Sequence, residues 1–260
     1  MQIIIIFLTL SLSFFTAFEA VAAPEPAPDR QRGEGPYGRL ILRGVTVING
    51  EGAPPVGPVD IVIEDNRIAS IRNVGYPGLP IEDEGRPEAR QGDRVLDLEG
   101  HYVLPGFIDM HAHFGGDAQG VPAEYVAKLW LAHGVTTIRE AGSFNGLAWV
   151  KEHQQRSASN AIAAPRIVPY AGFGMGSVEP IITPEQARRW VKDIARQGAA
   201  GIKFFGASPD IMKAALDEAK EQDLDSMMHH AQLNVAHWNV LDSARAGLGS
   251  MEHWYGLPEA

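Results

Sequence analysis

Two histidines separated by one residue, His111 and His113, follow the mostly apolar segment FIDM, residues 107–110. Side chains two positions apart on a β-strand point to the same face, so the two imidazoles can close on one metal ion. Zinc binds imidazole nitrogen at about 2.0–2.1 Å. Asp109 would share this face. The alternative interpretation is a pair of polar residues at the end of a strand.

Lys203 lies inside another apolar segment, GIKFF. A lysine that points into a protein core is costly unless it is paired or modified. The alternative is an edge strand that carries Lys203 on its solvent face. The pattern marks Lys203 as a second candidate for a functional site.

Two further histidines end apolar segments, His230 in SMMHH and His253 in SMEHW. His229 is a rival of His230, because successive strand residues face opposite ways and only one of the two can point inward. Because Ala231 follows it, His230 is the predicted ligand. The other histidines, which are expected at the surface or at helix caps, are His101, His133, His153 and His237.

Strand-like and helix-like segments alternate strictly after residue 106. The expected strands cover residues 107–111, 135–140, 166–170, 201–205, 226–230 and 250–254. The expected helices cover residues 122–133, 146–157, 183–197, 208–222 and 234–246. This alternation predicts an α/β fold, with an incomplete (β/α)8 TIM-type barrel of about six strands as the leading candidate. The carboxyl ends of parallel barrel strands meet at one rim, which would collect the candidate residues there.

Four parts of the chain are predicted. Residues 1–22 resemble a secretory signal peptide, with an apolar run over 3–18 and a small-residue cleavage site that ends at Ala22. An uncleaved anchor is the alternative, although a membrane span needs roughly 20 apolar residues. Residues 23–38 are expected to form a flexible leader, residues 39–104 the N-terminal part of a β-sandwich, and residues 105–260 the partial barrel. The protein is therefore expected to be secreted or periplasmic, without stable membrane insertion after cleavage.

The composition limits the partners and the chemistry. The formal net charge of −10 argues against nucleic acids and anionic membrane surfaces as partners. The chain has no cysteine. Metal ligands must therefore come from His, Asp, Glu or Lys, and no disulfide framework exists. Homo-oligomerisation is left open.

Several segments together resemble the amidohydrolase superfamily. RVLDLEGHYVLPGFIDMHAHF, residues 94–114, is similar to the segment that leads from its small β-sandwich into its distorted (β/α)8 barrel. LAHGVTTIREAG, GIKFF, MMHHA and GSMEHW resemble its second, fourth, fifth and sixth strands. Within the superfamily, the chain looks closest to the imidazolonepropionase-like and prolidase-like (Xaa-Pro dipeptidase) group.

The resemblance implies a hydrolase that acts on C–N bonds of a small-molecule or dipeptide substrate by metal-activated hydroxide. His111 and His113 would hold the more buried of two divalent metals, and zinc fits nitrogen and oxygen ligands best. Lys203, carboxylated by CO2, would bridge the metals, while His230 and His253 would hold the second. Lys203, His230 and His253 would thus be catalytic residues as well as ligands.

The resemblance also implies a seventh and an eighth strand, with an Asp at the end of the eighth, that have no counterpart in these residues. The chain is therefore expected to be truncated after the sixth strand. A catalytically inactive fragment that still binds metal, and one that never does, are alternatives. A mononuclear deaminase of the same superfamily is another, which Lys203 argues against. The Gly-rich residues 171–177 are expected to form a mobile loop near the substrate.

Overall fold

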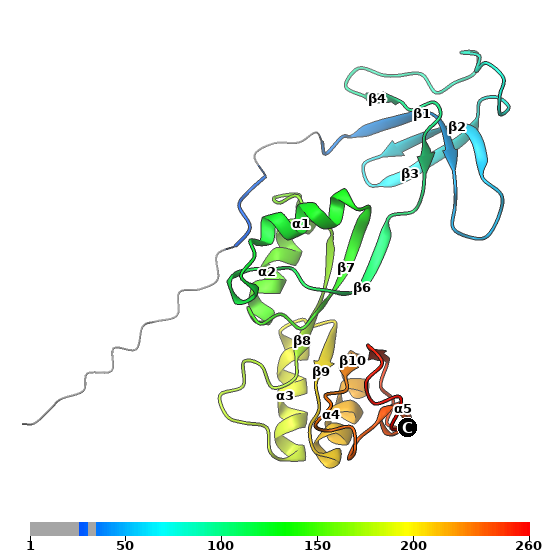
Figure 1. Ribbon diagram of the computed structural model, residues 1–260. Helices are drawn as coiled ribbons and strands as arrows, with labels where there is room; N and C mark the ends of the chain where they lie inside the picture. Colours follow the sequence, from blue (N-terminus) through cyan, green and yellow to red (C-terminus); the bar gives the residue numbers. More distant parts are fainter. Residues whose placement is uncertain (1–25, 31–34) are drawn as a thin grey trace, which may run out of the picture.

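The computed structural model describes residues 26–30 and 35–260, which contain two β-sheets (Figure 1). The predicted signal peptide, residues 1–22, lies outside the described residues. In the described part of the chain, no helix is long and apolar enough to cross a membrane.

The first sheet contains five strands from the region predicted as β-rich. These are β1 (Arg39–Val47), β2 (Val56–Glu64), β3 (Arg67–Asn73), β4 (Arg94–Asp97) and β5 (Tyr102–Val103). The order is β3-β2-β1-β4, and β5 also pairs with β1. The strands β1, β2 and β3 pair antiparallel, whereas β4 and β5 both run parallel to β1.

A long loop, residues 74–93, joins β3 to β4 and is held against this sheet by Arg86. Arg86 donates from Nε and Nη2 to the carboxylate of Asp60, both at 2.9 Å. The backbone N–H of Gly44 donates to the same carboxylate at 2.9 Å. Asp60 is fully buried, and a buried charge of this kind is tolerated because it is paired and hydrogen-bonded.

The second sheet is parallel throughout, in the order β11-β10-β9-β8-β7-β6. Its strands are β6 (Phe107–Ala112), β7 (Val135–Ala141), β8 (Arg166–Gly172), β9 (Gly201–Phe204), β10 (Asp225–His229) and β11 (Ser250–Glu252). The helices between them are η1 (Asp117–Gln119), α1 (Ala123–Ala132), α2 (Leu147–Ala158), α3 (Pro184–Arg196), α4 (Pro209–Glu221) and α5 (Val240–Arg245). The predicted alternation, and with it an incomplete (β/α)8 barrel, is confirmed.

The two faces of the parallel sheet differ in what covers them. Ile202, Phe204 and Met228 pack against α3 and α4 in the main hydrophobic core. Because strand residues alternate, Lys203 and its register partner Met227 lie on the other, interior face. The alternation of β9 therefore aims the one lysine of GIKFF inward.

Several elements have other bounds than predicted, and three of them lie in the last part of the chain. The helix expected over 234–246 is only α5, because Asn239 caps it by accepting from the N–H groups of Leu241 and Asp242. The strand expected over 250–254 ends at Glu252, since His253 has a left-handed φ of 63°. The strand expected over 226–230 ends one residue earlier, at His229.

Part of the segment predicted as a flexible leader is attached to the barrel. Ala27 is buried, and its N–H donates to Nε2 of His153 in α2 at 2.9 Å. Asp29 forms an ion pair with Arg156 of the same helix at 2.9 Å. These contacts place residues 26–30 against α2.

Candidate metal centre

Four of the five predicted site residues meet at the carboxyl ends of the parallel strands. The ring centroid of His111 lies 5.6 Å from that of His113 and 4.8 Å from that of His253. The Nζ atom of Lys203 lies 3.4 Å from Nε2 of His111. Lys203 is 2% exposed, so its amine is held inside the sheet beside these rings.

The fifth predicted residue, His230, does not lie in this cluster. Its ring is fully buried, and its Nε2 lies 2.8 Å from Oγ of Ser243 in α5. Its neighbour His229 has its ring centroid 4.8 Å from that of His253. His229 shares the interior face with Met227 and Lys203, because residues two apart on a strand point the same way. His229 therefore replaces His230 as the candidate ligand.

The backbone near Lys203 leaves no room for extra side chains. Gly142 follows β7 with a φ of +81°, and a Cβ there would lie 3.0 Å from Cβ of Lys203 and 3.2 Å from the backbone of Gly172. Only glycine combines this conformation with so close an approach. The backbone around Gly142 and Gly172 therefore restricts the path of the Lys203 side chain.

Two buried carboxylates contact the two histidines of the HxH motif. Oε2 of Glu252 lies 2.6 Å from Nδ1 of His111, and Oε1 of Glu140 lies 3.2 Å from Nδ1 of His113. The other oxygen of Glu140 is buried and has no hydrogen-bond partner among the described residues. Arg139, which is 5% exposed, donates from Nη2 to Oε1 of Glu252 at 2.6 Å.

Burial governs the ionisation of the cluster. It lowers the pKa of Lys203 to about 8, against an opposing effect of the Glu252 carboxylate. Burial also lowers the pKa values of His111 and His229, which favours the neutral imidazoles that bind metals. For Glu252, burial acts to raise the pKa, but hydrogen bonds from Ser250 and His111 outweigh it and lower the pKa.

The ring spacing fits shared metal ligation. Two imidazoles that bind one zinc at about 2.0–2.1 Å have centroids about 4.5–5.2 Å apart at N–Zn–N angles of about 90–109°. The separations of 4.8 Å, from His253 to His111 and to His229, lie in this range, whereas the 5.6 Å between His111 and His113 exceeds it. Within the described ranges, no three His, Asp or Glu side chains already form a complete ligand group. The residue types are ones that bind divalent ions, but the rings must shift before three of them reach one ion.

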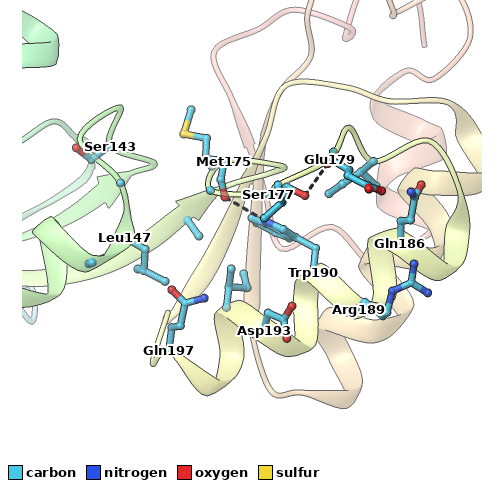
Figure 2. Close-up of a pocket in the computed structure, with 18 residues that line it drawn as sticks. Ser143, Leu147, Met175, Ser177, Glu179, Gln186, Arg189, Trp190, Asp193 and Gln197 are labelled. Atoms are coloured by element: carbon cyan, nitrogen blue, oxygen red, sulfur yellow. Dashed lines mark hydrogen bonds between the residues drawn. The ribbon is translucent and has the colours of Figure 1, made fainter. Parts of the chain in front are cut away.

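A cavity lies elsewhere, between α2, the loop after β8 and α3 (Figure 2). Its volume is about 530 Å³, and none of the site histidines lines it. The loop predicted to be mobile is bonded to α3 here, because Nε1 of Trp190 donates to the carbonyl of Met175 at 3.1 Å. Figure 2 shows Trp190 beneath this loop, so the loop belongs to the cavity and not to the histidine cluster.

Residue patterns alone did not single out Arg139, Glu140 and Glu252. Arg139 and Glu140 are a charged pair at the end of the apolar segment VTTIRE. Like Lys203, both are charged residues in an apolar segment, and charges in a core need partners. Glu252 precedes His253 at the end of an apolar strand, which is the same signal.

Comparisons with known proteins identify relatives of this chain. Residues 102–259 match the family model described as "Amidohydrolase family". An adenine deaminase of Bacillus velezensis is 34% identical over 203 residues, which cover 74% of this chain and 32% of that protein. A dihydroorotase of Bacillus subtilis is 25% identical over 166 residues, covering 61% and 39%. The chain thus spans about a third of the length of these curated relatives.

Solved structures share the fold. A prolidase complexed with N-methylphosphonate-L-proline has a TM-score of 0.63 and 20% identity, over 83% of this chain and 60% of that one. A Xaa-Pro dipeptidase with bound methionine has a TM-score of 0.60 and 22% identity, over 83% and 61%. At such identities the likeness concerns the fold alone.

Proposed function

The chain belongs to the amidohydrolase family, and we propose that it carries the metal centre of an enzyme that hydrolyses a C–N bond in a dipeptide or a cyclic amide. The observation that carries the proposal is the buried amine of Lys203 beside His111, His229 and His253 at the carboxyl ends of parallel strands. Active sites of such barrels lie at these strand ends. The solved neighbours with this fold include a prolidase and a Xaa-Pro dipeptidase, which makes dipeptides the first substrates to test.

The proposed ligands divide between two divalent ions, with zinc as the choice for these donors. His111 and His113 would hold one ion, His229 and His253 the other, and a carboxylated Lys203 would bridge both. When bound, the metals would activate a water molecule and polarise the scissile carbonyl. The histidine side chains themselves would supply the nitrogen donors, from strands that hold them close together.

Lys203 is suited to carboxylation because its amine is buried and its pKa is lowered to about 8. A neutral amine attacks the carbon of CO2, so that a C–N bond forms as one C=O π bond opens, and the amine then loses one proton to solvent water. The product is a carbamate anion with two oxygen donors. This change replaces a buried cation with an anion that divalent ions can stabilise.

Metal analysis and a substrate screen test the proposal. The purified protein should contain about two zinc equivalents, and Lys203→Ala and His111→Ala should each lose metal. His101→Ala is the matched control, because His101 is exposed and lies in the first sheet region. Dipeptides, cyclic amides and adenine should be tested with metal supplied, with ammonia release measured to detect deamination. Unchanged metal content in both site variants would reject the ligand set, and turnover of adenine alone would reject the substrate class.

A further inference from the structure

The carboxylate of Glu252 connects the two edges of the parallel sheet. Its strand β11 is the last of the order, whereas β6, which carries His111, is the first. These strands do not pair in the described sheet, yet Glu252 reaches Nδ1 of His111 at 2.6 Å. The contact therefore crosses the concave interior and joins elements that no backbone ladder holds together.

Arg139 holds both ends of this contact. Its Nη2 donates to Oε1 of Glu252 at 2.6 Å, and its Nε donates to the carbonyl of Met110 at 2.6 Å. Met110 is the residue directly before His111. The hydroxyl of Ser250 donates to Glu252 as well, at 2.8 Å. One guanidinium thus fixes both the backbone that presents the imidazole and the carboxylate that contacts it.

The hydrogen-bond pattern selects one tautomer of the His111 ring. The carboxylate of Glu252 is occupied by cationic and hydroxyl donors and can only accept, so Nδ1 of His111 must carry the proton. The lone pair is then left on Nε2, the nitrogen that faces Lys203 at 3.4 Å. A carboxylate behind a ligating histidine is a recurring way to orient the ring and raise its basicity.

We propose that Glu252, held by Arg139, is the positioning residue that presents Nε2 of His111 to the metal centre and sets its distance from His253. This inference rests on the proposed function, because it assumes that His111 is a ligand. Glu252 acts through His111 and does not touch the substrate. Glu252 also directly precedes His253. The end of β11 therefore positions one ligand at each edge of the sheet.

The first test reads the tautomer in the metal-free protein. Nitrogen-15 NMR of His111 should show a protonated Nδ1 in the native protein and a mixture of tautomers in Glu252→Ala. The same tautomer in both proteins would overturn the proposal. This readout needs no metal and no activity.

The second test measures zinc affinity by competition with a chelator. Glu252→Ala should weaken zinc binding about 10–100-fold, as loss of such outer partners typically does. Glu252→Gln should fall between, since its amide oxygen can accept from His111 while its amide nitrogen opposes Arg139. Asp60→Asn is the matched control, because it breaks a buried carboxylate–arginine pair in the first sheet and should lower the melting temperature without changing zinc affinity.

The outcomes distinguish failure of the positioning role of Glu252 from failure of the metal centre. If His111→Ala weakens zinc binding and both Glu252 variants bind zinc like the native protein, the positioning role is wrong and the metal centre stands. If His111→Ala also binds zinc like the native protein, the metal centre fails, and the role of Glu252 fails with it.

Discussion

The backbone N–H of Ala27 donates to Nε2 of His153 at 2.9 Å, while Nδ1 of the same ring lies 2.8 Å from the carbonyl of Trp149. The imidazole must therefore be neutral and carry its proton on Nδ1. His153 is fully buried, although the sequence predicted it at the surface or at a cap. A histidine thus attaches the segment before the first sheet to α2.

Acid should loosen this attachment. Burial lowers the pKa of His153, and the charge of Arg156 adds to the effect. As the pH falls, the unfolded chain takes up the proton at a higher pH than the folded protein does. The contribution of His153 to stability is therefore complete above about pH 6.5 and is lost as the pH drops through the folded-state pKa. Melting temperatures from pH 7.5 to 5 should fall more steeply for the native protein than for His153→Gln, whose amide does not titrate in this range. Equal slopes in the two proteins would contradict the prediction.

Substitution of the two adjacent histidines of β10 should have opposite effects. His229→Ala should lose bound zinc with little change in stability. His230→Ala should keep zinc but lose about 0.5–3 kcal/mol of stability, because a fully buried ring and its hydrogen bond with Ser243 are lost. Zinc content and urea denaturation of both variants check this. Loss of zinc from His230→Ala alone would return the ligand assignment to His230.

Lys203→Met should stabilise the metal-free protein. The folded-state pKa of about 8 lies below the ordinary lysine pKa of 10.5, so the cost of burying the ammonium is complete below pH 8 and disappears above about pH 10.5. At pH 7 the gain should be about 1–3 kcal/mol, since each pKa unit is worth about 1.36 kcal/mol. Chelator-treated proteins can be compared by urea denaturation. Lys220→Met, at an exposed position of α4, is the control and should change little.

The outer edge of β6 should promote self-association. Ile108 and Met110 are 62% and 54% exposed, and among the described strands β6 pairs only with β7. Apolar edges with unpaired backbone groups pair with other chains. Sedimentation velocity should show concentration-dependent association that Ile108→Lys reduces. Val178→Lys, which alters a fully exposed loop residue, should leave the association as it is.

Export is predicted from the apolar residues 3–18 and the small-residue site that ends at Ala22. Signal peptidases cut after such sites. N-terminal sequencing of the mature protein should therefore begin at Ala23. Recovery of a chain that begins with Met1 from the soluble cytoplasmic fraction would exclude cleavage.

The fold could be read from the sequence because its signals are local. Apolar alternation is a property of short segments, and so is the capping box of Thr183 with Gln186 that starts α3. The choice between His229 and His230 depended instead on where β10 ends and how it registers with β9. That register is set by packing between strands, which a single segment does not encode. The same holds for Glu252, whose partner His111 lies on the far edge of the sheet.

The first sheet has a consequence for how the chain tolerates cutting. Its central strand β1 pairs with β2, which precedes the loop 74–93, and with β4, which follows it. The bond from Arg86 to Asp60 spans the same interval. A protease nick in this loop would therefore leave two pieces that remain joined in one sheet. The loop is accordingly a natural place to divide the protein into two complementing halves or to insert a reporter domain.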